Sequence, residues 1–309
     1  MRTGPETIAA NRVEALSYLR PDVVARLASM ELRARLVVEG YMAGLHKSPY
    51  HGFSIEFTEH RPYIPGDDVK RIDWKAYGKT DRFYIKQFEE ETNLRTTIIV
   101  DASASMGFSS GGRLSKLEYA SYTAAALAYL MVQQRDAVGL VIFDEKERSA
   151  IPPRSTRSHL KLVWNELELL SPAGKTETAA VLNRVAESLT RRGLVIILSD
   201  LFDSQPEVMR ALKHFRHKGN EVIVLQILDP LERTFAFDRE AVFRDMENQD
   251  EMTTHPWHIR DTYRQAMADF VRAYKKECRD HSIDYALMDT ATTFDASLTE
   301  YLQFRSRLH

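Results

Sequence analysis

The 309-residue sequence has little of what marks secreted, membrane-spanning or nucleic-acid-binding proteins. Its one cysteine, Cys278, excludes an internal disulfide and any metal site built from paired cysteines. The longest apolar run, Ala124 to Val132, is too short to span a bilayer, and residues 1–6 lack the apolar core of a signal peptide. A net charge of -2 gives no electrostatic basis for binding nucleic acid or an anionic membrane. We therefore expect a protein without a transmembrane segment that works in the reducing cytoplasm.

What the sequence does contain is the composition of an ordinary globular chain, 44% hydrophobic and 28% charged. Its patterns divide it into a helical segment (1–45), a small β-rich segment (46–93) and a part where strands and helices alternate (94–309). The alternation predicts an α/β fold with a doubly wound, mostly parallel sheet flanked by helices. An insertion interrupts it at about 229–258.

The most informative stretch is 96–105, where a β-branched apolar run ends in an acid and two serines. The run predicts a buried strand. Asp101, Ser103 and Ser105 would then lie at its carboxyl end, where open α/β sheets bind ligands. One carboxylate and two hydroxyls are hard oxygen ligands, which suit Mg²⁺ or Mn²⁺. The same residue types also cap helices, so this short motif alone does not decide between a metal site and a cap.

Two further oxygen donors come from other parts of the α/β region. A second apolar strand, 194–199, ends at Asp200, and a loop before it places a hydroxyl at Thr176. The complete set resembles, in order and in structural setting, the metal-ion-dependent adhesion site of von Willebrand factor A domains. Its members are Asp101, Ser103, Ser105, Thr176 and Asp200.

This resemblance implies a function for each member of the set. The two serines and the threonine would contact Mg²⁺ or Mn²⁺ directly or nearly so, and the two aspartates would hold the ion through water. A carboxylate from a protein partner would complete the coordination shell. The fold that the resemblance implies is the von Willebrand factor A type, a Rossmann-like α/β sheet.

A second resemblance lies in the β-rich segment, which mixes alternating strand-like runs with turn residues. It is similar to the signature of the bacterial domain-of-unknown-function family numbered 58, in which such a segment precedes a von Willebrand A-like domain. The matching positions are Arg61, Tyr63, Pro65, Gly66, Asp67, Asp68, Arg71, Asp73, Trp74, Ala76, Asp81 and Arg82. The resemblance covers the chain from about residue 44 onward. It implies a MoxR-type AAA+ ATPase as a partner, in the assembly or maturation of other proteins.

The chemistry of this signature stays open at the level of sequence. Asp67, Asp68 and Asp73 are acid–base or metal residues in one interpretation, and turn residues that pair with arginines in another. Their convergence on the metal site would favour the main alternative function, a metal-dependent phosphoester hydrolase. A nucleic-acid-binding surface is the third interpretation, although the chain has no basic excess. Its candidate residues are Arg71, Trp74, Tyr77 and Lys79.

Several local patterns in the α/β part predict structure near the site. Ser115 and Glu118 form a capping box that starts a helix. Residues 149–151 predict an edge strand that stops at the prolines 152–153. In the insertion, 241–244 and 252–254 predict a hairpin, and Cys278 falls on a helical apolar stripe, which indicates core.

We expect from these observations a protein that is not an enzyme. The predicted site contains no general base beside a nucleophile and no nucleotide pocket. A metal ion with hydroxyl ligands and one open position suits recognition of an acidic side chain on a protein partner.

Overall fold

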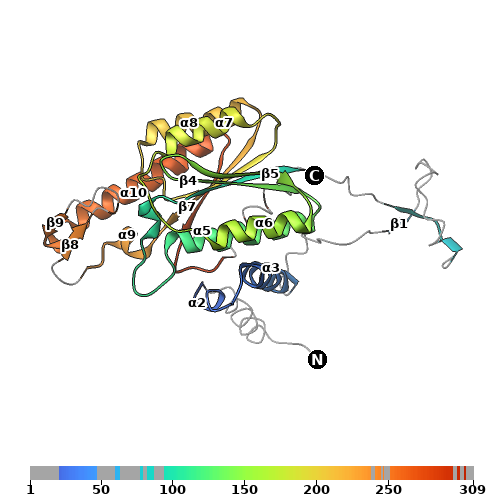
Figure 1. The fold of residues 1–309 in the computed structure, drawn as a ribbon, viewed down its shortest axis with the longest axis horizontal. Coiled ribbons are helices and arrows are strands. Elements are labelled where there is room, and N and C mark those ends of the chain that lie inside the picture. Colours follow the sequence, from blue (N-terminus) through green and yellow to red (C-terminus); the bar gives the residue numbers. More distant parts are fainter. Residues whose placement is uncertain are drawn as a thin grey trace.

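The computed structural model describes residues 21–46, 60–62, 77–78, 82–86, 94–237, 241–244, 246, 251–294, 298–299 and 303 (Figure 1). Much of the β-rich segment, including Asp67, Asp68 and Asp73, lies outside these ranges. In the part of that segment that is described, β1 (His60–Pro62) and β2 (Tyr84–Lys86) pair as antiparallel strands.

The described strands of the α/β part form a six-stranded sheet in the order β10–β7–β6–β3–β4–β5. All neighbours run parallel except β4 and β5, which are antiparallel. Helices lie on both faces (Figure 1), so the predicted α/β fold with a doubly wound, mostly parallel sheet is confirmed. The strands are β3 (Arg95–Asp101), β4 (Ala137–Phe143), β5 (Glu147–Arg154), β6 (Leu194–Ser199), β7 (Glu221–Leu228) and β10 (Asp284–Asp289).

The order of the strands reverses between β3 and β6. From β3 the chain proceeds outward to β4 and β5, and it then returns to build β6, β7 and β10 on the other side of β3. In open α/β sheets, ligands bind in the crevice at such a switch point, outside the carboxyl ends of the strands. Asp101 ends β3 and Asp200 directly follows β6, so the topology brings both acids to this point.

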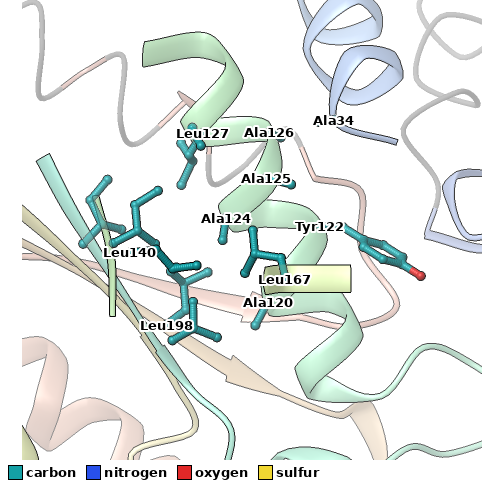
Figure 2. Close-up of a cluster of buried hydrophobic side chains, with 14 of the residues drawn as sticks. Ala34, Ala120, Tyr122, Ala124, Ala125, Ala126, Leu127, Leu140, Leu167 and Leu198 are labelled. Carbon is teal, nitrogen blue, oxygen red and sulfur yellow. The ribbon is translucent and has the colours of Figure 1, made fainter. Parts of the chain in front are cut away.

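On one face of the sheet, helix α5 (Lys116–Gln133) is covered from two sides. Leu140 and Leu198 of the sheet approach it from one side, and α3 (Met30–His46) lies on the other (Figure 2). Residues 124–128 are therefore each 0% exposed, although they point around the whole helix. A helix that is apolar all round is one that lies inside a core. The neighbouring helices are α2 (Pro21–Val24) and α6 (Arg157–Glu168).

On the opposite face, the helices α7 (Thr178–Ser188), α8 (Gln205–His217) and α10 (Pro256–Asp280) each bury one side against the sheet. Cys278 of α10 is fully buried in this second core, which confirms its predicted position. Within the described ranges, none of the helices combines the length and apolar character that crossing a bilayer requires.

The edge strand β5 is longer than the sequence predicts. The predicted stop at Pro152 is wrong, because β5 continues through both prolines to Arg154. A proline lacks an N–H, but an edge strand pairs on one side only and tolerates this loss where the missing donor faces outward. The irregular pairing with β4, whose register shifts between Val138 and Leu140, also reduces the need for regular donors.

The insertion after β7 begins with the short helix α9 (Pro230–Thr234) and continues into an antiparallel hairpin, β8 (Ala241–Arg244) and β9 (Glu251–Thr254). This confirms the predicted hairpin, which starts one residue earlier than expected in its second strand. The Phe235 ring, just after α9, lies 5.3 Å from the ring of Phe243 in β8 and 4.3 Å from that of Tyr263 in α10. Aromatic packing thus fastens the insertion to α10.

Candidate metal centre

Asp101, the last residue of β3, is the buried centre of the candidate site. Its side chain is 0% exposed. Its Oδ1 accepts a hydrogen bond from the Ser103 backbone N–H at 2.9 Å, and its Oδ2 accepts one from the Ser199 hydroxyl at 2.6 Å. Burial, reinforced by the negative charge of nearby Asp200, raises the pKa of Asp101 from 3.8 to about 6. The two predicted acids are therefore close enough to repel each other.

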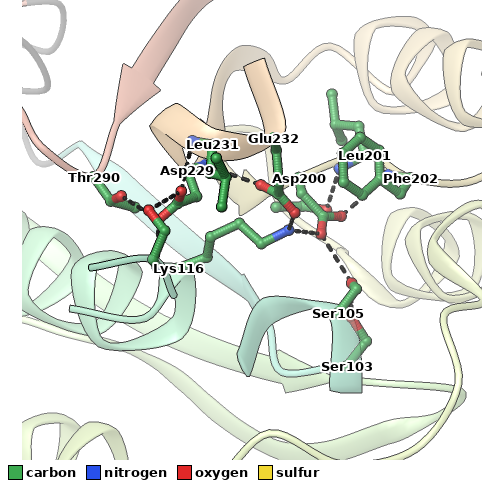
Figure 3. Close-up of polar contacts among 12 residues, drawn as sticks. Ser103, Ser105, Lys116, Asp200, Leu201, Phe202, Asp229, Leu231, Glu232 and Thr290 are labelled. Carbon is green, nitrogen blue, oxygen red and sulfur yellow. Dashed lines mark hydrogen bonds and ion pairs between the residues drawn. The ribbon is translucent and has the colours of Figure 1, made fainter. Parts of the chain in front are cut away.

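The two predicted serines join these acids in one chain of contacts. The hydroxyls of Ser103 and Ser105 lie 3.2 Å apart, and Ser105 donates to Asp200 Oδ2 at 2.8 Å (Figure 3). The other oxygen of Asp200, Oδ1, accepts the backbone N–H of Phe202 at 3.1 Å. The structure thus brings together Asp101, Ser103, Ser105 and Asp200, which come from two strand ends about a hundred residues apart.

The loop that contains Thr176 is attached to the site at both of its ends. Near its start, the Ala173 N–H bonds the Ala102 carbonyl at 3.0 Å, and the Ala104 N–H bonds the Gly174 carbonyl at 3.1 Å. Beyond its end, the Ala179 N–H in the first turn of α7 bonds Asp203 Oδ2 at 3.0 Å, just after Asp200. Thr176 therefore lies between two anchors on the two strand-end loops.

Arg148 on β5 holds this loop from the other side. Its guanidinium donates to Asp144 Oδ2 at 2.6 Å, to the Ser171 carbonyl at 2.8 Å and to the Ala173 carbonyl at 2.8 Å. A planar guanidinium fixes several acceptors in a defined geometry. Arg148 is therefore a positioning residue for the loop.

Sequence reasoning missed the cation of the site, Lys116. The Lys116 ammonium is 0% exposed and donates to Asp200 Oδ2 at 2.7 Å and to Glu232 Oε1 at 2.7 Å (Figure 3). Burial lowers the pKa of Lys116, but the negative charges of Asp200 and Glu232 raise it by more. The pKa therefore lies above its usual value, and the group stays an ammonium ion. Burial raises the pKa of Glu232, and the charge of Lys116 opposes this change.

A signal for Lys116 was present in the sequence. The predicted capping box of Ser115 and Glu118 is confirmed, and it makes Lys116 the first residue of α5. A cation is unfavourable at a helix N-terminus because the helix dipole is positive there. A lysine at this position therefore favours an acidic partner nearby, although the sequence does not identify which acid.

Glu232 also belongs to a second polar cluster that anchors α9. Asp229 caps α9 by accepting the Leu231 N–H at 2.8 Å, and Glu232 accepts the Asp229 N–H at 2.9 Å. Asp229 further accepts the backbone N–H of Ser110 at 3.0 Å, which ties α9 to the loop before α5. The insertion is therefore connected to the candidate site through Glu232 and Lys116.

The residues present fit a hard divalent cation in their chemistry. Buried carboxylates that repel each other, next to hydroxyl oxygens, are stabilised by a positive ion with oxygen preference. Among the described residues, no group of three or more His, Cys, Asp or Glu side chains could hold a metal ion. The hydroxyls of Ser103, Ser105 and Thr176 would therefore have to be part of any ligand set. Close to this loop, Thr178 Oγ1 is also buried, without a hydrogen-bond partner in the described structure.

Most residues of the two alternative functions lie outside the described part of the chain. Asp67, Asp68 and Asp73, on which the hydrolase alternative depends, lie outside the described residues, as do Arg71, Trp74 and Lys79 of the nucleic-acid alternative. Tyr77 is described, and its ring stacks on that of Phe83 with centroids 4.5 Å apart.

Solved structures with a similar fold include an aerotolerance-related membrane protein of Bacteroides fragilis, which is 22% identical with a TM-score of 0.47. The similarity covers 69% of this chain and 99% of that one. The von Willebrand factor domain of the type V pili tip protein Mfa5 of Porphyromonas gingivalis is 10% identical with a TM-score of 0.35, over 71% of this chain and 97% of that domain. At these identities the likeness concerns the fold alone.

Comparisons of sequence identify the family of the chain. It is 28% identical over 231 residues to the uncharacterized protein Rv1480 of Mycobacterium tuberculosis, which covers 74% of this chain and 72% of that protein. The family model described as protein of unknown function DUF58 matches residues 59–273, well over half of the chain. The protein therefore belongs to the DUF58 family.

Proposed function

We propose that this protein binds an acidic side chain of a protein partner through Mg²⁺ or Mn²⁺ held by Asp101, Ser103, Ser105, Thr176 and Asp200. The proposal depends on one observation, the buried oxygen cluster at the switch point between β3 and β6. Asp101, Ser103, Ser105 and Asp200 are joined there by contacts of 2.6 to 3.2 Å, directly or through Ser199. A bound divalent ion would supply positive charge and an open coordination position for a carboxylate.

We further propose that the cluster serves binding and not catalysis. Both oxygens of Asp101 accept hydrogen bonds from Ser199 and Ser103, and both oxygens of Asp200 accept donors as well. Carboxylates held in this way are fixed in position, which suits a rigid binding site. We therefore propose a protein that is not an enzyme.

The partner that we propose to test first is a MoxR-type AAA+ ATPase. This choice is supported by the resemblance of the 46–93 segment to its family's signature, and a cytoplasmic location is part of the same proposal. The insertion that begins with α9 is the candidate docking region beside the site, because Glu232 connects it to Lys116.

A metal titration tests the proposal. We expect Mn²⁺ or Mg²⁺ to raise the melting temperature of the parent protein and to bind in calorimetry, because a ligand that binds only the folded state stabilises it by RT ln(1 + [L]/Kd). At a hundredfold excess over Kd this amounts to about 2.7 kcal/mol. The Asp200→Ala variant should lose the stabilisation and remain folded.

Asp280→Ala is the matched control, because Asp280 is an exposed aspartate at the last residue of α10, just before β10 begins and therefore at the sheet edge opposite the carboxyl ends of the strands. It should behave like the parent. Binding of the parent to the ATPase should then require Mg²⁺ and disappear with a chelator. A parent protein that shows neither metal-dependent stabilisation nor calorimetric binding would rule the proposal out.

A further inference from the structure

The Lys116 ammonium is bonded to Asp200, a member of the proposed metal site. Asp200 Oδ2 accepts both the ammonium of Lys116 at 2.7 Å and the hydroxyl of Ser105 at 2.8 Å (Figure 3). Lys116 is fully buried, and its Nζ lies 4.7 Å from the centre of the Phe202 ring. A buried ammonium is costly unless it is paired, so this position is a specific one.

Lys116 also has a second acceptor away from the strand ends. Its Nζ lies 2.7 Å from Glu232 Oε1 on α9, the same distance as to Asp200. Asp200 belongs to the proposed ligand set, whereas Glu232 belongs to the insertion. The ammonium is therefore shared between a residue of the site and a residue outside it.

We infer that Lys116 is a built-in counter-cation that sets the affinity of the proposed metal site. This inference rests on the proposed function. Without metal, the ammonium neutralises Asp200 and keeps the buried acids compatible with folding. A divalent ion that binds to the cluster competes with the ammonium for Asp200. Glu232 then keeps the ammonium paired, so that the competition does not leave a buried charge without a partner.

The arrangement predicts opposite effects for two substitutions. Lys116→Met removes the competing charge and retains an unbranched apolar chain of similar length. Mn²⁺ should then bind about tenfold more tightly or better, the scale of change that residues bordering a metal site produce. Glu232→Gln removes the alternative partner of Lys116 and leaves the ammonium on Asp200, so Mn²⁺ should bind about tenfold more weakly. The glutamine carbonyl can still accept the Asp229 N–H that caps α9.

The experiment is a calorimetric titration of the full chain with Mn²⁺ alone, checked by the electron paramagnetic resonance signal of free Mn²⁺. The parent, Lys116→Met, Glu232→Gln and the control Lys161→Met are compared. Lys161 is an exposed lysine on α6, and its replacement should leave the dissociation constant unchanged. Circular dichroism establishes that each variant is folded, and if Lys116→Met does not fold, Glu232→Gln alone decides.

The outcomes separate this inference from the proposed function. Tighter binding by Lys116→Met together with weaker binding by Glu232→Gln, both relative to a measurable parent dissociation constant, supports the inference. If the parent binds Mn²⁺ through Asp200 but neither variant changes the dissociation constant, or both change it in the same direction, the inference is overturned and the proposed function stands. If no protein in the series binds Mn²⁺, both fail.

Discussion

Two regions of this protein contain side chains that are equally buried but opposite in polarity. One is the apolar layer between the sheet and α5, where Ile98, Val100 and Leu127 are each 0% exposed. The other is the polar cluster one residue further along β3, where Asp101 and Asp200 are also 0% exposed. The same strand passes from one region into the other.

The burial of the two regions has different effects on stability. Burying apolar surface is favourable by about 25 cal/mol per Å², so stability alone explains the layer under α5. Burying carboxylates and an ammonium is unfavourable unless every group is paired, and an apolar replacement of a buried ion pair is often as stable. Stability therefore does not explain the polar cluster, which is why we assign the function to it.

The largest effect on stability should come from the apolar layer. We expect Leu127→Ala to lower the free energy of unfolding by about 2–5 kcal/mol, because it removes a buried side chain and leaves a cavity. Urea denaturation measures this change. Leu169→Ala is the control, since Leu169 is 81% exposed, and it should change stability by less than about 0.5 kcal/mol.

The Mn²⁺ affinity of the same variant tests whether the apolar layer and the polar cluster are independent. Leu127→Ala should leave the Mn²⁺ dissociation constant unchanged while it weakens the fold. A loss of Mn²⁺ binding as large as that of Asp200→Ala, at a temperature where the variant is folded, would contradict the separation of the two regions.

A smaller effect is expected at the loop that holds Thr176. Gly174 has a φ of 76°, and a Cβ there would lie 2.9 Å from Asp144 Oδ2. Gly174→Ala should cost about 1–2 kcal/mol from the left-handed backbone, and it should also weaken Mn²⁺ binding because the loop must shift away from Asp144. Urea denaturation and calorimetry measure the two effects separately.

Gly112→Ala is the matched control for this prediction. Gly112 has a φ of 69°, but a Cβ there would have no atom within 4 Å. The backbone cost should therefore appear without a change in the dissociation constant. Equal weakening of Mn²⁺ binding by both variants would show that the clash between the added Cβ and Asp144 is not the cause of the weaker binding.

The smallest effect is expected at Cys278, an ionisable group inside an apolar layer. Burial raises the pKa of the Cys278 thiol from 9.0 to about 12. The native protein at pH 8 should therefore hold about a thousandfold less thiolate than an exposed cysteine and should not react with iodoacetamide. Labelling in urea should be complete, and mass spectrometry measures both.

The direction of the pH dependence follows from the same shift. The unfolded thiol ionises near pH 9 and the native thiol only near pH 12, so the native state keeps its proton longer. Cys278 should therefore weaken folding as the pH rises between these values. Rapid labelling of the native protein at pH 8 would contradict the burial of this group.

Much of the fold followed from local pattern. Apolar runs such as 194–199 and the capping box at Ser115 produce strands and helices at the predicted places, because periodicity and capping act within a few residues. The strand β5 was one exception, since whether Pro152 ends a strand depends on which neighbours the strand has.

The candidate site was predictable only in part. Asp101 and Asp200 could be found because acids at the ends of apolar strands converge wherever the strands run parallel. Lys116 and Glu232 could not be paired from the sequence, because they are separated by 116 residues and meet only through the position of α9. The same holds for Arg148, whose three acceptors come from the turn just before its own strand and from the loop that begins at Ser171.

The sequence by itself determined the strands, most helix starts and the oxygen donors at the ends of β3 and β6, because these depend on side-chain periodicity and local hydrogen bonding. Only the tertiary structure decided that α5 is covered by α3 on its outer side and that Lys116 is shared between Asp200 and Glu232. The physical reason is that a charge pair or a packed face is defined by distance in space, and chain positions far apart reach that distance only after the sheet has formed.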